Sequence, residues 1–282
     1  MSFSGRENAP MPKVLVTGSS GLIGRATVER LESVGWSVRG FDLAGGDDLR
    51  DAAAVGRAAR GCDAVVHAGA IAHDDNGTPD DIVATNVLGT WHVLTAAEHH
   101  DICRVVYVSS AQVFGCAEGE GEPLYLPVDD EHPLRAARPY GMSKRLAEQM
   151  CEIWGARTGA TTVVLRPVLV LDDRLLTRFT ESSAEYGAFV HVDDVATAIE
   201  RAVEADLDGH LRVTLCGPGA FDSDLARRRL AWEPQRSWPD PGELESMRAL
   251  AHEGSGGERA VRGELPRRIR MRLGRWRRAV IR

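Results

Sequence analysis

The chain has 282 residues, 43% of them hydrophobic, and a formal net charge of −7. This length and composition predict one large α/β domain, or one domain with a small lobe, around a sizeable core. The sequence has no run of eighteen apolar residues, so a membrane span is not expected, and the first thirteen residues are too polar to predict a signal peptide.

The cysteine pattern indicates a reducing environment. Five cysteines lie scattered without a C-x-x-C pair: Cys62, Cys103, Cys116, Cys151 and Cys216. An odd, unpatterned set is typical of free cytoplasmic thiols and favours neither a disulfide framework nor a zinc site. We therefore expect a cytoplasmic protein without a bound metal.

Short apolar segments alternate with helical patterns along the chain. The segment 21–35 has apolar residues at helical spacing and ends at Gly35. Alternating strands and helices predict right-handed βαβ units and a parallel sheet covered by helices on both faces. Strands are predicted at 13–18, 37–42, 62–70, 103–110 and 161–170, and a last helix is predicted at 237–250.

The segment GSSGLIG follows the first predicted strand and begins the first helix. Gly18 permits a tight turn, Gly21 lets the backbone approach a pyrophosphate, and Gly24 lets the helix pack closely against the sheet. Free N–H groups at the start of a helix attract phosphates. The segment therefore predicts a dinucleotide site.

Asp42 ends the second predicted strand, eighteen residues after Gly24. A carboxylate at this place holds the ribose hydroxyls of the adenosine and repels a 2′-phosphate, which favours NAD over NADP. Strand alternation places the nearby Arg39 on the opposite side.

Tyr140 and Lys144 lie four residues apart at the start of another helical pattern, RPYGMSKRLAEQM, and so share one helix face. A neighbouring ammonium lowers the pKa of a phenol because the positive charge favours the phenolate. Such a pair suits general acid/base work on an alcohol or a ketone. The same pair also occurs on protein surfaces, so the assignment depends on the rest of the chain.

Further segments strengthen this interpretation. Over residues 13–240 the chain resembles the extended short-chain dehydrogenases/reductases, the NAD-dependent epimerase/dehydratase group. The resemblance rests on the G-x-x-G-x-x-G turn and on DDLRD (47–51), VVHAGA (65–70), TNVLGT (85–90), VVYVSSAQVFG (105–115), PYGMSK (139–144), LRP (165–167) and FVHVDDVATAI (189–199).

The resemblance implies NAD as the cofactor, which performs the hydride step. It implies that Asp48 and Leu49 contact the adenine and that Asn86 supports the backbone of the active site. The cofactor-binding residues that it implies are Gly18, Ser20, Gly21, Leu22, Ile23, Gly24, Asp42, Asp48, Leu49, His67, Ala68, Gly69, Asn86, Tyr140, Lys144, Pro167 and Val168.

The resemblance also implies a catalytic set of Ser110, Tyr140 and Lys144. Tyr140 would exchange the substrate's hydroxyl proton, Ser110 would donate a hydrogen bond to the substrate oxygen, and Lys144 would hold the nicotinamide ribose and lower the pKa of Tyr140. The expected function is that of an NAD-dependent oxidoreductase or epimerase acting on a secondary alcohol or ketone of a sugar-like substrate.

Several positions depart from the family pattern. Only 22 residues separate Arg166 from Phe189, where members that bind nucleotide sugars use several tens more, and Gly187–Ala188 replaces a common Arg-Asp pair. Leu169 replaces an asparagine. Arg174 or Arg178 could still meet a diphosphate, or both could lie on a solvated helix face. The candidate substrate residues are Ala70, Ser110, Ala111, Gln112, Arg174 and Arg178.

These departures narrow the substrate. Dehydratases of the group carry Asp-Glu where this chain has Ala111 and Gln112, so a 4,6-dehydratase is not expected. The short middle segment is similar in length to the compact uronate-dehydrogenase branch, which oxidises free sugar acids. A nucleotide-sugar 4-epimerase or reductase remains an alternative, as does an NAD-binding regulatory or scaffold protein without activity.

The expected fold class is α/β, a Rossmann-type doubly wound parallel sheet with a small, reduced C-terminal substrate lobe. The expected organisation is an N-terminal arm (1–12), an NAD-binding Rossmann domain (13–165), the lobe with elements returning to the core (166–252), and a flexible linker with an arginine-rich tail (253–282). A homodimer would fit the family.

In the segment HVDDVA, His191, Asp193 and Asp194 are expected to have structural roles, with an aspartate capping a helix.

The tail is strongly basic. Residues 258–282 contain ten arginines and two acidic residues, a net charge of +8, which leaves −15 for the rest of the chain. In LPRRIRMRLGRWRRAVIR, apolar residues recur at three or four positions, which outlines a basic amphipathic helix. Three interpretations stay open: a disordered tail, docking on the acidic globule or a partner subunit, or contact with an anionic membrane or nucleic acid. Of these three, contact with a membrane or with nucleic acid is the least expected.

Overall fold

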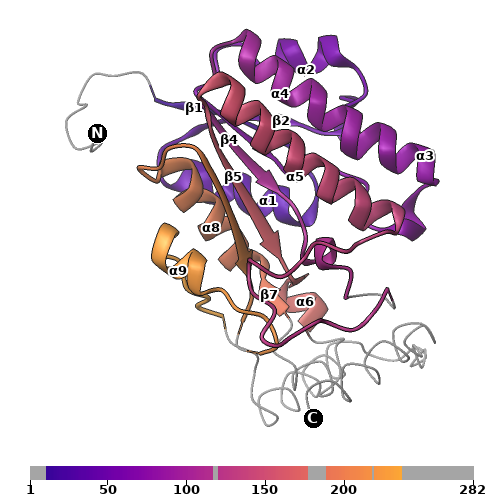
Figure 1. Cartoon of the computed structure of the whole chain (residues 1–282). Helices are drawn as coiled ribbons and strands as arrows, with labels where there is room; N and C mark the ends of the chain where they lie inside the picture. Colours follow the sequence, from indigo (N-terminus) through magenta and orange to yellow (C-terminus); the bar gives the residue numbers. More distant parts are fainter. Residues whose placement is uncertain (1–10, 117–119, 177–188, 218, 237–282) are drawn as a thin grey trace, which may run out of the picture.

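A computed structural model describes residues 11–116, 120–176, 189–217 and 219–236. These residues form one six-stranded, fully parallel sheet in the order β2-β1-β3-β4-β5-β8 (Figure 1). Its strands are β1 (Lys13–Thr17), β2 (Ser37–Phe41), β3 (Ala64–His67), β4 (Arg104–Val108), β5 (Thr161–Pro167) and β8 (His210–Leu215). The order reverses between β1 and β3, and the carboxyl ends of such strands are where open α/β sheets bind ligands.

Helices cover both faces of the sheet (Figure 1). Successive residues of β1 show why: Val14 and Val16 pack toward one face, while Leu15 packs toward the other. On the first face lie α1 (Leu22–Ser33), α8 (Val192–Glu204) and α9 (Asp224–Leu230), and on the second lie α2 (Ala52–Ala59), α4 (Gly89–His99) and α5 (Pro139–Thr158). The two apolar layers place the sheet in the middle of the core.

Shorter elements connect these layers. Two strands, β6 (Leu169–Leu171) and β7 (Phe189–His191), form a separate parallel pair. The remaining short helical segments are η1 (Leu43–Gly45), η2 (Asp74–Asn76), α3 (Pro79–Ile82), the π-helical η3 (Val83–Leu88), η4 (Ala111–Phe114) and α6 (Asp173–Leu176).

The α/β fold class predicted from the sequence is confirmed, and the five predicted strands are present with shorter bounds. The predicted strand 161–170 corresponds to two strands. In the main sheet β5 ends at Pro167, and β6 pairs with β7 outside that sheet. The edge strand β8 was not predicted, since His210 and Arg212 interrupt its apolar pattern.

The expectation of an aspartate cap in HVDDVA is wrong in detail. The residue that caps α8 is His191, whose Nδ1 accepts a hydrogen bond from the Asp193 N–H at 3.2 Å. Asp194 instead accepts from the backbone N–H groups of Gln235 and Arg236, both at 3.0 Å. The Asp193 carboxylate lies 3.4 Å from the Arg236 guanidinium. All three side chains therefore have structural partners, but the imidazole takes the capping position.

Some predictions lie outside the described residues: the last helix at 237–250, the linker at 253–258 and the arginine-rich tail. Within the described part of the chain, none of the helices has the length and apolar character needed to cross a membrane.

Candidate functional site

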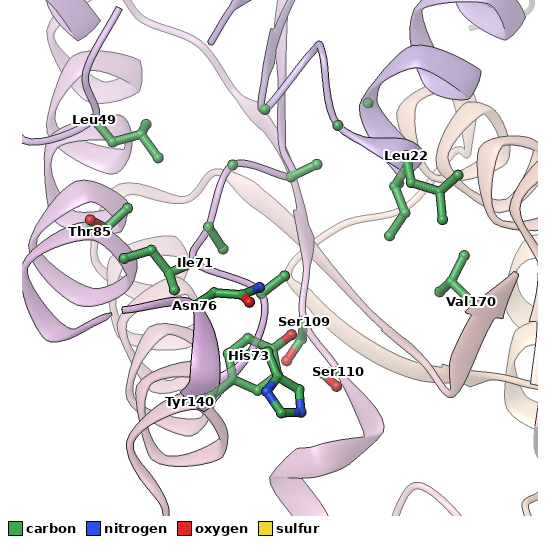
Figure 2. Close-up of a pocket in the computed structure, with 18 of the residues that line it drawn as sticks. Leu22, Leu49, Ile71, His73, Asn76, Thr85, Ser109, Ser110, Tyr140 and Val170 are labelled. Carbon is green, nitrogen blue, oxygen red and sulfur yellow. The ribbon is translucent and has the colours of Figure 1, made fainter. Parts of the chain in front are cut away.

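A cavity of about 910 Å³ lies at the carboxyl ends of the central strands (Figure 2). Each strand from β1 to β5 contributes the residues that follow it, and α5 adds Tyr140. Its walls include the glycine turn after β1, Asp42 after β2, Ala68–His73 after β3, Ser109–Gln112 after β4 and Pro167–Val170 after β5. The cavity therefore occupies the place where the fold predicts a ligand.

The glycine turn has no room for side chains. Gly18 has a φ of +69°, and a Cβ there would lie 2.6 Å from the Cα of Gly69. A Cβ on Gly24 would lie 1.9 Å from the Gly18 carbonyl oxygen. Gly21 begins α1 without a side-chain cap, and the first turn carries no acidic residue. A tight backbone turn at the start of a helix is compatible with the predicted pyrophosphate site.

Asp42 joins the glycine turn to η1. Its Oδ2 accepts from the Ser20 N–H at 3.0 Å, and its Oδ1 accepts from the Ala44 N–H at 2.9 Å. Asp42 lines the cavity, whereas Ser20 contributes its backbone to this contact and does not line the wall. The Arg39 guanidinium points to the other side and donates to the Ala58 carbonyl at 2.6 Å.

The wall near Asp42 continues with acidic side chains. Asp48 and Leu49 both line the cavity, as do Asp47 and Asp81. The Arg50 guanidinium donates to Asp48 at 2.6 Å and holds the pKa of that carboxyl below its usual value. Arg50 also lines the cavity, so the cation at this end is one that is paired with a carboxylate.

Two of the implied cofactor residues lie behind the wall. His67 is buried between the Thr17 hydroxyl, 2.7 Å away, and the Thr90 hydroxyl, 3.0 Å away, and burial lowers its pKa to about 3. Asn86 brackets the backbone of Ile71, accepting from its N–H at 2.8 Å and donating to its carbonyl at 3.0 Å. Neither lines the cavity, and both support segments that do.

Ser110 and Tyr140 line the same cavity (Figure 2). Ser110 caps η4, because its Oγ accepts from the Gln112 N–H at 3.2 Å. Tyr140 lies in the first turn of α5, after Pro139. Tyr140 is 7% exposed and is therefore a buried residue of the cavity wall.

Lys144 lies one turn further along α5 and does not line the cavity. Its Nζ donates to the Val108 carbonyl at 2.8 Å and lies 4.9 Å from the Tyr107 ring centroid and 5.9 Å from that of Tyr140. Burial lowers the pKa of Lys144 to about 8, against the opposing charge of Glu148. At neutral pH the ammonium is therefore still mostly protonated, close to the Tyr140 ring.

His73 was not singled out in the sequence, yet its imidazole lines the cavity toward the end that holds Ser110 and Tyr140 (Figure 2). Its Nδ1 accepts from the Asp75 N–H at 3.1 Å. The next residue, Asp74, accepts from the Tyr140 N–H at 2.7 Å. This contact fixes the η2 turn against the start of α5, and no local spacing in the sequence signals it.

The remaining predicted site residues fall into two groups, those that line the cavity and those that do not. Ala70, Ala111, Gln112 and Val168 line the cavity, and so do Ala68, Gly69 and Pro167. Arg174 does not: its side chain is 81% exposed and pairs with Asp172 at 3.1 Å. Arg178 lies outside the described residues. The described residues also contain no cluster of side chains suited to a metal ion.

Asp130 lies beyond the cavity wall and accepts a hydrogen bond from the Thr214 hydroxyl at 2.7 Å. Burial raises its pKa from 3.8 to about 6. Between pH 4 and pH 6 the folded protein therefore keeps a proton that the unfolded chain has already released, and the stability of the fold decreases as the pH rises through 6.

Asp130→Asn removes this titration. When the pH rises from 5 to 8, we expect the unfolding free energy of the variant to increase by about 1–3 kcal/mol relative to that of the wild type. Melting temperatures at the two pH values test this, and a constant difference would contradict it.

A glycine turn without room for side chains, a carboxylate and a buried tyrosine line one cavity, and a lysine lies buried behind it. These features are typical of dinucleotide-dependent oxidoreductases. Comparison with known proteins gives the family. Residues 14–216 match the model of the NAD dependent epimerase/dehydratase family. The chain belongs to this family and is an NAD-dependent enzyme of its dehydrogenase and epimerase class, as the sequence predicts.

Characterised relatives are similar over most of the chain. Uronate dehydrogenase of Pseudomonas syringae pv. tomato is 28% identical over 224 residues, which cover 74% of this chain and 76% of that protein. L-arabinose 1-dehydrogenase (NAD(P)(+)) of Haloferax volcanii is 32% identical over 225 residues, which cover 73% and 88%.

Solved structures share the fold. A short-chain dehydrogenase/reductase superfamily protein from Agrobacterium tumefaciens with bound NAD superposes with a TM-score of 0.71 at 24% identity, covering 86% of this chain and 97% of that one. UDP-glucose 4-epimerase from Thermotoga maritima with UDP-glucose has a TM-score of 0.70 at 19% identity, covering 86% and 99%.

Proposed function

We propose that this chain acts on a secondary alcohol or ketone of a compact, free sugar-like substrate, with Ser110, Tyr140 and Lys144 as the catalytic residues. The observation that carries the proposal is that Ser110 and Tyr140 line one continuous cavity with the glycine turn and Asp42. The reacting groups and the dinucleotide cradle therefore share one space.

Each side chain has a distinct task in this proposal. NAD, when bound, supplies the hydride acceptor or donor. Tyr140 holds at Oη the proton that a substrate hydroxyl releases or a carbonyl takes up, and Ser110 donates a hydrogen bond to the same substrate oxygen. Lys144 places its buried charge near the Tyr140 ring, which favours the phenolate. An ammonium has three N–H donors, so its bond to Val108 leaves two for other partners.

Two features favour a free sugar or sugar acid over a nucleotide sugar. A diphosphate needs a cationic partner, and Arg174 does not line the cavity, with a side chain that is 81% exposed. The segment between Arg166 and Phe189 has only 22 residues. The names of the uronate and arabinose dehydrogenases support the same substrate class. Because Ala111 and Gln112 supply no acidic group at the cavity, a 4,6-dehydratase is not proposed.

The alternative is a nucleotide-sugar 4-epimerase or reductase, in line with the epimerases among the similar proteins. A substrate panel separates the two: NADH formation with D-glucuronate, D-galacturonate or L-arabinose, against conversion of UDP-galactose to UDP-glucose without net NADH. We expect NADH from at least one free sugar or sugar acid. Conversion of UDP-galactose alone would establish the alternative, and bound NAD without any turnover would favour a binding module.

We further propose a homodimer built on α4 and α5, which lie side by side (Figure 1). Large apolar side chains are exposed on η3, α4 and α5: Val83, Leu88, Trp91, Leu146 and Ile153. Exposed apolar side chains on neighbouring helices favour a protein interface.

Trp91→Glu combined with Ile153→Glu is expected to convert the dimer to a monomer, because two buried carboxylates would face an apolar interface. Light scattering after size-exclusion chromatography measures the mass. Leu124→Glu is the control, since Leu124 is 60% exposed and lies outside these helices. A wild-type chain that is already monomeric would contradict the proposal.

A cytoplasmic location is also proposed. All five cysteines are free, and all but Cys103 are buried, which suits a reducing compartment. Recovery of the chain from a periplasmic or secreted fraction would contradict this.

A further inference from the structure

Glu148 of α5 and Arg166 of β5 form an ion pair inside the core. Their side chains are 0% and 1% exposed. The guanidinium makes two bonds to the carboxylate, Nε to Oε1 at 2.9 Å and Nη2 to Oε2 at 2.7 Å. A buried pair of this kind contributes little net stability compared with apolar side chains of the same size. The role of the pair is therefore better inferred from the residues that it contacts than from the stability that it adds.

The carboxylate of the pair also holds the end of β4. The Ser109 hydroxyl donates to Glu148 Oε1 at 2.6 Å. The preceding residue, Val108, accepts from the Lys144 ammonium at 2.8 Å. Lys144 and Glu148 lie one turn apart on α5, so one helix fixes two consecutive residues of the strand end. The next residue is Ser110, which lines the cavity with Ser109 (Figure 2).

The pair also sets the electrostatic surroundings of Lys144. The titratable groups that act on or lie against this ammonium are Tyr140, Glu148 and Cys151 from α5, Tyr107 from β4 and His67 from β3, with Arg166 from β5 behind Glu148. Burial holds His67 neutral and raises the pKa values of Tyr107 and Cys151, so these groups carry no charge near pH 7. Glu148 is thus the carboxylate that offsets the buried ammonium.

We propose that Glu148 and Arg166 are positioning residues of the active site: their ion pair fixes Ser109, and through it Ser110, while the Glu148 carboxylate balances the charge of Lys144. The inference rests on the roles proposed above for Ser110, Tyr140 and Lys144. It adds a buried layer beneath them, in which Arg166 orients the carboxylate and is itself held near Asp130, 4.0 Å away.

The sequence makes the charge effect directly measurable, because the chain has only two lysines, Lys13 and Lys144. In the NAD-bound protein labelled with [¹³Cε]lysine, an NMR titration follows both. We expect Glu148→Gln to lower the pKa of Lys144 by about one unit, since a negative charge is lost, and Arg166→Met to raise it by a similar amount. The Lys13 signal should not move in either variant.

Unchanged Lys144 titration in both variants, or shifts of the same sign, would overturn the charge balance. This readout needs no substrate, so it can fail while the proposed function stands, and Tyr140→Phe tests that function separately.

A single change leaves one buried charge unpaired and can unfold the chain, so a double variant tests the positioning role. Glu148→Met with Arg166→Met removes both charges, which proteins often tolerate. We expect this variant to fold and to bind NAD within threefold of wild type. We also expect its kcat for NAD-dependent D-glucuronate oxidation, or for whichever panel substrate is turned over, to fall at least tenfold, because Ser109 loses its partner. Wild-type kcat in the folded double variant would overturn the proposal.

Discussion

Tyr140→Phe is expected to lower kcat by about 10²–10⁴-fold while NAD binds with unchanged affinity. Phenylalanine fills the same space in the first turn of α5, so the fold and the cavity walls should persist. Only the phenolic oxygen is lost, and with it the group that exchanges the substrate proton. NADH formation at saturating NAD measures kcat, and calorimetry measures NAD affinity.

Tyr125→Phe provides a matched control for this change. Tyr125 is 42% exposed and donates to Asp129 at 2.8 Å, away from the cavity lining. Its loss should leave kcat within twofold of wild type. If Tyr140→Phe kept more than a tenth of the wild-type turnover, the assignment of Tyr140 as the general acid/base would fail.

The second large effect concerns the glycine turn. Gly24→Ala is expected to weaken NAD binding at least 100-fold, because its Cβ would lie 1.9 Å from the Gly18 carbonyl oxygen. The helix can only move away from the turn, and that movement opens the cradle for the pyrophosphate. Calorimetric titration with NAD measures the loss, and circular dichroism checks that the variant is folded.

Gly56→Ala is the control for a glycine replacement elsewhere. Gly56 lies inside α2, and a Cβ there would meet nothing within 4 Å. Alanine is a better helix former by about 1 kcal/mol, so this variant should be slightly more stable and bind NAD normally. Equal NAD binding by Gly24→Ala and Gly56→Ala would show that the cavity at the turn is not the cofactor site.

The local patterns of the sequence predict several residues that line the cavity, for physical reasons. The glycine turn has its sequence signature because backbone atoms meet there at distances that exclude a Cβ. Asp42 is predictable because it directly follows a strand at a fixed distance from that turn. The positions of Ser110 and Tyr140 follow from motif spacing on a strand end and a helix start, and both line the cavity.

What the sequence does not reveal is set by contacts between distant segments. His73 reaches the cavity because Asp74 accepts from the Tyr140 N–H, 66 residues away. Charged residues are expected on the surface, so the sequence does not predict the buried Glu148–Arg166 pair. The pair forms because α5 packs against β5. Arg174 is the converse case, since its nearby partner Asp172 pairs with it on the surface and its side chain is 81% exposed.

The central claim is that this cavity binds NAD through the glycine turn and Asp42, for chemistry at Ser110 and Tyr140. The most direct measurement is calorimetric titration of nucleotide-free protein with NAD and with NADP. The account predicts one NAD per chain, bound at least tenfold more tightly than NADP because the Asp42 carboxylate repels a 2′-phosphate. Tighter binding of NADP, or NAD binding that survives Gly24→Ala unchanged, would contradict it.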